Sequence, residues 1–126
     1  MIKIVIATHN GLGRAYLDTL QLIMGKQENI EIVEVDINTS LDSLKNVINN
    51  QVDASAGTII LTDMFGGTPS NISIPYSVKD KVEVVFGLNL PMLITAVSKR
   101  SKMKLGELAE AVAKAGRDSI FKVSDF

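Results

Sequence analysis

Cysteine and tryptophan are both absent from this sequence of 126 residues, and histidine occurs once. Without cysteine the chain can form neither a disulfide scaffold nor a cysteine-ligated zinc site, and thiol chemistry is excluded. The lack of tryptophan, with only four phenylalanines, argues against a platform of aromatic rings for nucleic-acid bases. A formal net charge of −1 with mixed signs also argues against nucleic acid as the main partner.

Long hydrophobic runs are missing as well. The apolar runs are about six residues long, whereas a membrane-spanning helix needs roughly 20. Met1–Lys3 leads straight into a strand-like run, without the apolar region and small-residue cleavage site of a signal peptide. Hydrophobic residues still make up 46% of the chain, which is enough for a real core. We therefore expect residues 1–126 to form one soluble, cytoplasmic domain.

Short apolar runs rich in β-branched residues alternate with segments of helical pattern. The expected strands are Ile2–Ala7, Ile30–Val35, Thr58–Leu61, Val82–Phe86 and a last short one at Ile120–Val123. The expected helices are Leu12–Met24, one opened by Thr39 and Ser40 with the apolar stripe Leu41, Leu44, Val47 and Ile48, one that begins at Thr68, Pro91–Val97, and Lys104–Ala115. Pro75 should kink or stop the helix that begins at Thr68, and Gly25 and Gly116 should end two others.

This alternation predicts an α/β fold, with one doubly wound, mainly parallel sheet and helices on both faces. In such folds ligands bind beyond the carboxyl ends of the strands. His9, Asp63 and the loop Gly87–Pro91 each follow an expected strand directly. We therefore expect all three on one rim of the sheet.

The stretch after the third expected strand is central to the prediction of function. It passes through Asp63 and a pair of glycines to Thr68, which is placed to cap a helix that begins with proline. A carboxylate at Asp63 would fix the tautomer of the His9 ring and leave its other nitrogen free to attack. Amides around Gly66, Gly67 and Thr68, with the Thr68 hydroxyl, would bind phosphoryl oxygens. We predict that His9 carries a phosphoryl group, without a metal or cofactor.

Each of these residues also has an ordinary structural interpretation. A lone histidine is more often structural or merely exposed than catalytic, and Asp63 could be a turn-forming aspartate. Gly11–Tyr16 resembles the start of a dinucleotide fingerprint, but Tyr16 occupies the place of its third glycine. Asp36 suits a ribose contact and the plain end of a strand equally well. The sequence has no P-loop, no acidic pair after the first strand and no nucleophile elbow.

Four stretches carry a more specific signal, namely Ile4–His9, Leu61–Asn71, Gly87–Leu93 and Ala115–Arg117. In this order and spacing they resemble the mannose-family enzyme IIA (EIIA) proteins of the bacterial phosphoenolpyruvate-dependent sugar phosphotransferase system (PTS). The resemblance covers almost the whole chain. Its most specific part is the loop Asp-x-x-Gly-Gly-Ser/Thr-Pro combined with an early Thr-His pair.

The resemblance implies a phosphocarrier enzyme. His9 would accept a phosphoryl group on Nε2 from the histidine-containing phosphocarrier protein (HPr). It would pass the group to a IIB protein, which phosphorylates sugar as it crosses the IIC/IID membrane complex. Asp63 would orient the ring through Nδ1, and Thr68 would supply a hydroxyl to the phosphate loop. The sugar would belong to the mannose, fructose, sorbose or N-acetylgalactosamine class, and the protein would be cytoplasmic, peripheral to the transporter through its partners.

The fold implied by the resemblance is a parallel four-stranded sheet completed by an antiparallel strand, which the two chains of a homodimer exchange. Ile120–Val123 is the candidate for the exchanged strand. Asn10 departs from the glycine that usually follows the histidine, and Phe65 stands where some relatives have tryptophan. Because the chain ends at Phe126, we expect the IIB domain to be a separate protein.

Two other functions stay open from the sequence. The chain could be the phosphohistidine subunit that serves dihydroxyacetone kinase, a related group in which the Gly-Gly-Thr-Pro loop is absent. It could also be a regulatory module that uses its phosphorylated state as a signal. A nucleotide-binding domain of the same fold class is not expected.

Overall fold

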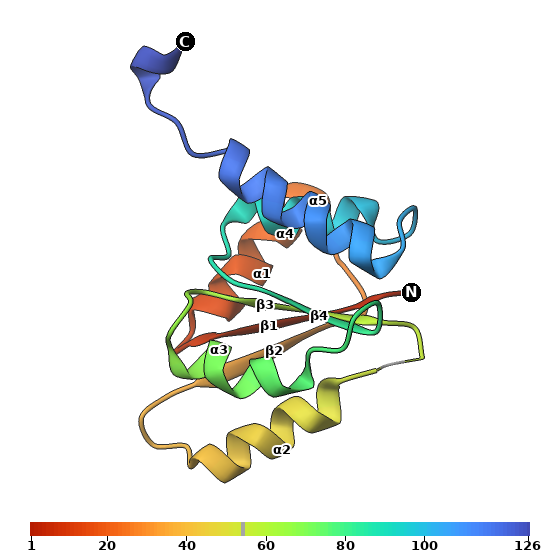
Figure 1. The fold of residues 1–126 in the computed structure, drawn as a ribbon. Helices are drawn as coiled ribbons and strands as arrows, with labels where there is room; N and C mark the ends of the chain where they lie inside the picture. The colour runs from red at the N-terminus through yellow and green to blue at the C-terminus, as the bar shows by residue number, and fades with distance from the viewer. Residues whose placement is uncertain (54) are drawn as a thin grey trace.

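Four parallel strands form the sheet, in the order β2-β1-β3-β4 (Figure 1). The structure, a computed structural model, describes residues 1–53 and 55–126. The strands are β1 (Lys3–His9), β2 (Ile30–Val35), β3 (Thr58–Thr62) and β4 (Val82–Val85). The helices are α1 (Leu12–Met24), α2 (Leu41–Gln51), α3 (Thr68–Ser73), α4 (Leu90–Lys99) and α5 (Leu105–Asp118), with 3₁₀ turns η1 (Ile74–Tyr76) and η2 (Val123–Asp125). The predicted α/β fold with its four-stranded parallel sheet is confirmed.

The two central strands, β1 and β3, determine which residues lie at the carboxyl edge of the sheet. β1 pairs with both β2 and β3, and the register sets Ala7 opposite Thr62 and His9 opposite Val35. β3 is buried along its whole length, as a strand covered on both faces should be. Because parallel strands end at the same edge, the residues after β1 and β3 emerge side by side.

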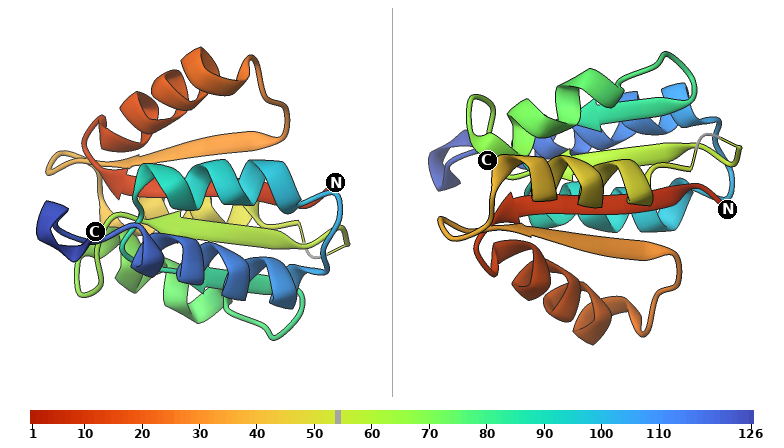
Figure 2. Two further views of the ribbon diagram at one scale, coloured as in Figure 1. Left: turned by 90° about the horizontal axis from the view of Figure 1, so that it is seen from above. Right: turned by 90° about the horizontal axis from the view of Figure 1, so that it is seen from below.

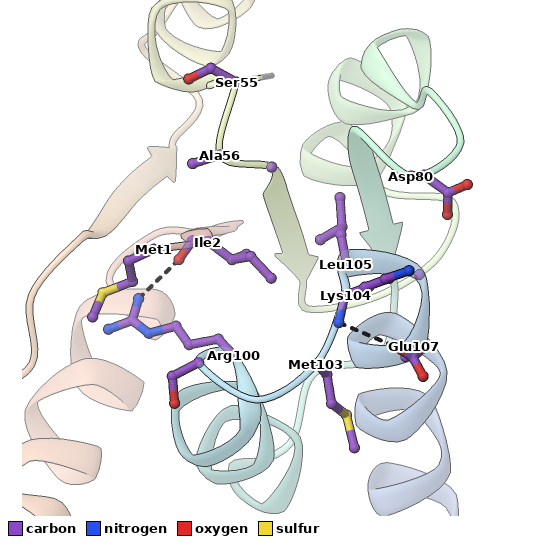
Figure 3. A pocket seen from close by; sticks show the side chains of 13 residues that line it. Met1, Ile2, Ser55, Ala56, Asp80, Arg100, Met103, Lys104, Leu105 and Glu107 are labelled. Atoms are coloured by element: carbon purple, nitrogen blue, oxygen red, sulfur yellow. Dashed lines mark hydrogen bonds between the residues drawn. The ribbon is translucent and has the colours of Figure 1, made fainter.

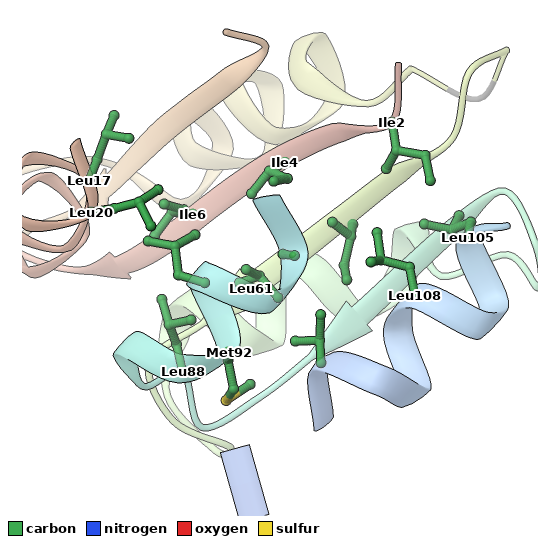
Figure 4. Packing of buried hydrophobic residues seen from close by; sticks show 14 residues of the cluster. Ile2, Ile4, Ile6, Leu17, Leu20, Leu61, Leu88, Met92, Leu105 and Leu108 are labelled. Carbon is green, nitrogen blue, oxygen red and sulfur yellow. The ribbon is translucent and has the colours of Figure 1, made fainter. Parts of the chain in front are cut away.

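Two layers of helices cover the two faces of the sheet. Figure 2 shows α1, α4 and α5 across one face and α2 and α3 across the other. Alternate residues of β1 supply both cores: Ile4 and Ile6 pack in the cluster under α1, α4 and α5 (Figure 4), whereas Val5 and Ala7 belong to the cluster under α2 and α3. The nearly continuous apolar sequence of β1 follows from this double coverage.

The helices α2 and α3, on the face opposite α1, α4 and α5, form where the sequence predicted helices. Ser40 caps α2, since its side chain accepts a hydrogen bond from the backbone of Ser43 at 3.2 Å. Of the predicted apolar stripe, Leu44 and Ile48 are buried, whereas Leu41 and Val47 are exposed. α3 ends at Ser73 and gives way to the 3₁₀ turn that contains Pro75, which confirms the predicted break.

Gly116 does not end the last helix as predicted. α5 continues through it to Asp118, and the carbonyl of Gly116 accepts a hydrogen bond from Nδ2 of Asn89 at 3.2 Å. A Cβ atom at Gly116 would lie 2.6 Å from Sδ of Met92. This glycine therefore allows α5 to pack closely on α4. Gly25, by contrast, has φ +84° and ends α1 as expected.

The segment Ile120–Val123 does not form the predicted short strand. It leaves α5 as an irregular tail that ends in η2 and projects from the body of the chain (Figure 1). Ile120, Phe121 and Val123 are exposed, and the ring of Phe121 contacts that of Phe126 edge to face. A strand requires a neighbouring backbone for its hydrogen bonds, and within residues 1–53 and 55–126 this tail pairs with none of the four strands. Exchange with a second chain stays a prediction.

A cavity of about 800 Å³ lies at the amino ends of the strands, opposite the rim that carries His9 (Figure 3). The buried guanidinium of Arg100 lies beside it and donates to the carbonyl oxygens of Ile2, Asn29 and Glu28 at 3.2, 3.2 and 2.6 Å. Burial lowers the pKa of Arg100, and the charge of Glu28 opposes this shift. Arg100 thus ties the end of α4 to the start of β1 and to the loop before β2.

Candidate active site

His9 and Asp63 meet at the carboxyl ends of β1 and β3. Nδ1 of His9 lies 2.9 Å from Oδ2 of Asp63, and the backbone N–H of His9 donates to the same oxygen at 2.9 Å. His9 is the last residue of β1 and Asp63 follows the last residue of β3. The predicted neighbourhood of the imidazole and the carboxylate is therefore present in the structure.

The carboxylate determines which ring nitrogen is available. An ionised carboxylate only accepts hydrogen bonds, so Nδ1 of His9 carries the proton and donates it toward Asp63. In the neutral ring Nε2 then has a free lone pair. The His9 side chain is 43% exposed, whereas that of Asp63 is 10% exposed. The Nδ1 side of the ring is therefore held by Asp63, and Nε2 on the other side is the nitrogen that can act as a nucleophile.

Asp63 stays ionised in this environment. Burial alone would raise the pKa of its carboxyl, but the hydrogen bonds from the backbone and ring of His9 outweigh burial and lower the pKa below its usual value. The other oxygen, Oδ1, accepts the backbone N–H of Met64 at 3.0 Å. These contacts hold the negative charge directly beside the ring.

The glycine pair brings the backbone against the imidazole. Gly66 has φ +88°, a conformation that glycine adopts without strain. Gly67 packs on the ring: a Cβ atom there would lie 2.6 Å from Cε1 of His9 and 3.2 Å from Nε2. The loop thus runs along the open edge of the imidazole, where sequence reasoning placed it.

The prediction that Thr68 caps α3 is wrong. Gly67 is the N-cap, while Thr68 is the first helical residue and Pro69 lies in the first turn. The side chain of Thr68 is not needed as a cap. It lines a cavity of about 350 Å³ together with His9.

Most of the remaining wall of this cavity comes from the end of β2, the start of α2 and the connection between them, which sequence reasoning did not assign to the site. The lining residues besides His9 and Thr68 are Asn10, Val35, Asp36, Ile37, Thr39, Leu41 and Leu44. Oδ1 of Asp36 accepts hydrogen bonds from the backbone of Asn38 at 2.8 Å and from the backbone and hydroxyl of Thr39, both at 3.0 Å. These bonds lower the pKa of Asp36 and make it a loop-forming residue. The spacing Asp36-x-Asn38-Thr39 is a turn signal that could have pointed to this loop.

The loop Gly87–Pro91 lies at the same rim, where it connects the end of β3 to the start of α4 through hydrogen bonds. The backbone N–H of Leu88 donates to the carbonyl of Thr62 at 2.9 Å, and Asn89 caps α4 by accepting from the backbone of Met92 at 3.1 Å. The hydroxyl of Tyr16 donates to the carbonyl of Leu88 at 3.0 Å. Burial, with the charge of Asp63, raises the pKa of Tyr16 and keeps it a donor.

Residues 1–53 and 55–126 contain neither of two further features, a cluster of metal-binding side chains and a membrane-spanning helix. No group of three or more histidine, cysteine, aspartate or glutamate side chains there is placed to hold a metal ion. No helix in the same residues is long and apolar enough to cross a membrane.

Known proteins share both the sequence pattern and the fold. The family model for the PTS system fructose IIA component matches residues 3–113. The chain is 30% identical over 124 residues to the PTS mannose-specific EIIAB component of Escherichia coli (strain K12), covering 94% of this chain and 38% of that protein. It is 28% identical over 116 residues to the PTS sorbose-specific EIIA component of Lacticaseibacillus casei, covering 90% of this chain and 84% of that protein.

The similarity extends to three dimensions. The crystal structure of the PTS component EIIA from Streptococcus agalactiae superposes with a TM-score of 0.92 at 30% identity, over 100% of both chains. Together with the family match over residues 3–113, this confirms the resemblance found in the sequence. The chain belongs to the EIIA family of the phosphotransferase system, in the group that includes mannose, fructose and sorbose components.

Proposed function

We propose that His9 accepts a phosphoryl group on Nε2 from phospho-HPr and passes it to a IIB protein, for uptake of a sugar of the mannose, fructose, sorbose or N-acetylgalactosamine class. The observation that carries this proposal is the contact of 2.9 Å between Nδ1 of His9 and Oδ2 of Asp63. It leaves Nε2 as the nucleophile on the exposed side of the ring. Membership of the EIIA family supports the same assignment.

The transfer step needs no separate acid or base. The lone pair of Nε2 attacks phosphorus, the P–N bond of the donor phosphohistidine breaks, and the donor imidazole leaves with that electron pair. His9 keeps its proton on Nδ1, so the phosphorylated ring becomes positively charged. Asp63 stabilises this charge at a distance of 2.9 Å. Transfer to the IIB protein is the same displacement in the other direction. A nucleophile of the IIB protein attacks phosphorus, the P–Nε2 bond breaks, and the His9 ring leaves with that electron pair.

The phosphoryl oxygens require donors, and the proposal assigns them to the backbone of Gly66, Gly67 and Thr68 with the hydroxyl of Thr68. Gly67 lies against the Nε2 edge of the ring, and Thr68 lines the cavity beside it. Oriented amides of this kind stabilise a transferring phosphoryl group without reorganisation. Phosphoryl transfer depends mainly on such positioning, so the site needs no metal ion in this proposal.

Protein partners must approach His9 from its open side, because the other side faces Asp63. Exposed apolar side chains lie on the segments beside it. Ile37 (97% exposed) and Leu41 (51%) line the cavity next to His9, and Met64 (54%) and Phe65 (71%) belong to the loop that carries Gly67. Apolar side chains grouped at one surface are typical of a protein-binding site. We assign this surface to the HPr and IIB proteins, which both have to reach Nε2.

The proposal extends to assembly and location. As a single domain in the cytoplasm, the protein would act on the IIC/IID membrane complex only through the IIB protein. A homodimer that exchanges residues 120–123 would add an antiparallel strand to the sheet beside β4, which is an edge strand in the single chain. Burial of the exposed Ile120, Phe121 and Val123 would favour this exchange.

Labelling by phospho-HPr tests the proposed function. The protein should acquire one acid-labile, base-stable phosphoryl group, and His9→Gln should acquire none while keeping its fold by circular dichroism. Addition of a IIB protein of this family should then remove the label. Label on the His9→Gln variant, or none on the wild type, would refute the proposal.

A further inference from the structure

The hydroxyl groups of Thr62 and Ser70 form a buried pair directly behind the loop that follows Asp63. Both residues are fully buried, and their hydroxyl oxygens are 2.7 Å apart. The hydroxyl of Ser70 also contacts the carbonyl oxygen of Met64. A carbonyl oxygen only accepts, so Ser70 donates its single proton to Met64. Thr62 must therefore donate to Ser70, which fixes the direction of both hydrogen bonds.

These hydrogen bonds connect the three parts of the chain that build the site. Thr62 ends β3, Ser70 lies in the first turn of α3, and Met64 belongs to the loop between them. The side chains of Met64 and Phe65 are 54% and 71% exposed, and on the outer side of the loop the ring of Phe65 contacts that of Phe86 with centroids 5.2 Å apart. From the interior, the pair holds the loop backbone at Met64.

The position of this loop matters because Gly67 lies on the His9 ring. The carbonyl of Gly67 accepts the backbone N–H of Asn71 at 3.0 Å, so Gly67 moves with the first turn of α3. Ser70 belongs to the same turn. A shift of α3 relative to β3 would therefore change the distance between the amides of the loop and Nε2 of His9.

We propose that the Thr62–Ser70 pair is a positioning device for phosphoryl transfer, which sets the distance between the Asp63–Thr68 loop and His9. This inference rests on the proposed function of His9. Two buried hydroxyl groups offer little net stability over two apolar side chains of the same shape. They do provide a directed chain of hydrogen bonds, from Thr62 to Ser70 and from Ser70 to the carbonyl of Met64, which apolar packing lacks.

The decisive variant is Ser70→Ala, which removes the hydrogen bond to Met64 and leaves the hydroxyl of Thr62 without its partner. The double variant Thr62→Val/Ser70→Ala removes both hydroxyl groups and avoids that unpaired group. We expect both to lower the single-turnover rate of acceptance at saturating phospho-HPr by roughly 10- to 100-fold, the effect of a misplacement of about 1 Å. Thr62→Ser keeps the hydroxyl donor to Ser70 and should therefore have a rate near that of the wild type.

Ser73→Ala is a matched control. Ser73 is also fully buried in α3 and donates to the carbonyl of Pro69 at 2.7 Å, within the helix and away from the loop. Ser73→Ala removes one buried hydroxyl from the same helix, and it should keep the wild-type rate per folded molecule. Equal rates for Ser70→Ala and Ser73→Ala would show that the Thr62–Ser70 pair is only structural.

A second measurement separates this inference from the proposed function. Amide hydrogen exchange in unphosphorylated protein should be faster at residues 65–68 in Thr62→Val/Ser70→Ala than in the wild type, and unchanged in Ser73→Ala. Unchanged exchange at residues 65–68 would overturn the positioning role even if transfer were slow. If wild-type protein accepted no phosphoryl group, the proposed function would fail, and with it the catalytic purpose of the pair.

Discussion

The backbone of Gly67 packs so closely on His9 that a Cβ atom at residue 67 would lie 2.6 Å from Cε1 of the ring. The φ angle of Gly67 is −92°, which any residue adopts, so glycine is required here for space alone. Gly66 shows the opposite case, with φ +88° and nothing within 4 Å of an added Cβ. Of these adjacent glycines, one therefore makes room for the ring and the other allows the turn.

Gly67→Ala should disable the site without unfolding the chain. The added methyl group must displace the exposed His9 ring or the loop, because a contact of 2.6 Å is too short. We expect the rate of acceptance from phospho-HPr to fall about 100-fold. Gly11→Ala, close to His9 in sequence but with nothing within 4 Å of the added atom, is the control and should keep the wild-type rate. A normal rate for Gly67→Ala would mean that the loop plays no part in transfer.

Asp63→Asn should slow acceptance and shorten the lifetime of the phosphohistidine. The amide lacks the negative charge that stabilises the phosphorylated ring, and its NH₂ group can donate to Nδ1 and favour the wrong tautomer of His9. We expect a loss of roughly 100-fold or more in the single-turnover rate. Asp42→Asn, which changes an exposed carboxylate at the start of α2, should have no effect. Unchanged kinetics for Asp63→Asn would make Asp63 a turn residue only.

The lowered pKa of Asp63 predicts how stability depends on pH. Its pKa in the folded protein lies below the usual value of 3.8, so the folded state favours the ionised carboxylate. This contribution to stability is complete above about pH 4 to 5 and is lost as the pH falls through the folded pKa. The difference in unfolding free energy between wild type and Asp63→Asn should therefore shrink as the pH falls below about 4. A difference that stays constant or grows below pH 4 would contradict the assignment.

Ile37→Ser tests whether the cavity rim contacts protein partners. Ile37 is 97% exposed on a loop whose backbone donates hydrogen bonds to Asp36, so removal of its side chain should cost little stability. We expect a rise of roughly 5- to 10-fold in the KM for phospho-HPr with kcat nearly unchanged, which corresponds to about 1 kcal/mol of lost apolar contact. Leu22→Ser is the matched control, because Leu22 is 88% exposed near the far end of α1. Equal KM values for the two variants would exclude Ile37 from the interface.

The sequence predicted those features that depend on local pattern and strand order. The β-branched runs gave the strands of the sheet, and the rule that parallel strands share an edge placed His9 beside Asp63. The break at Pro75 and the end of α1 at Gly25 follow from the chemistry of single residues. Each of these inferences needed no knowledge of how distant side chains pack.

Features that depend on packing were missed. Gly116 was predicted to end α5, but its contact with Met92 comes from a different helix and leaves no local signal. The strand predicted at Ile120–Val123 is absent from the single chain because apolar sequence alone does not supply a neighbouring strand. The cavity wall around Ile37 was missed because the loop after β2 reaches His9 only in the folded sheet.

The most direct test of the central claim is ¹⁵N NMR of the His9 ring before and after phosphorylation by phospho-HPr. In unphosphorylated protein above the pH at which the ring protonates, Nδ1 should carry the proton and Nε2 should be bare, as the bond to Asp63 requires. After transfer, the phosphoryl group should be on Nε2, with Nδ1 still protonated. A phosphoryl group on Nδ1, or a ring unchanged by the donor, would contradict the account.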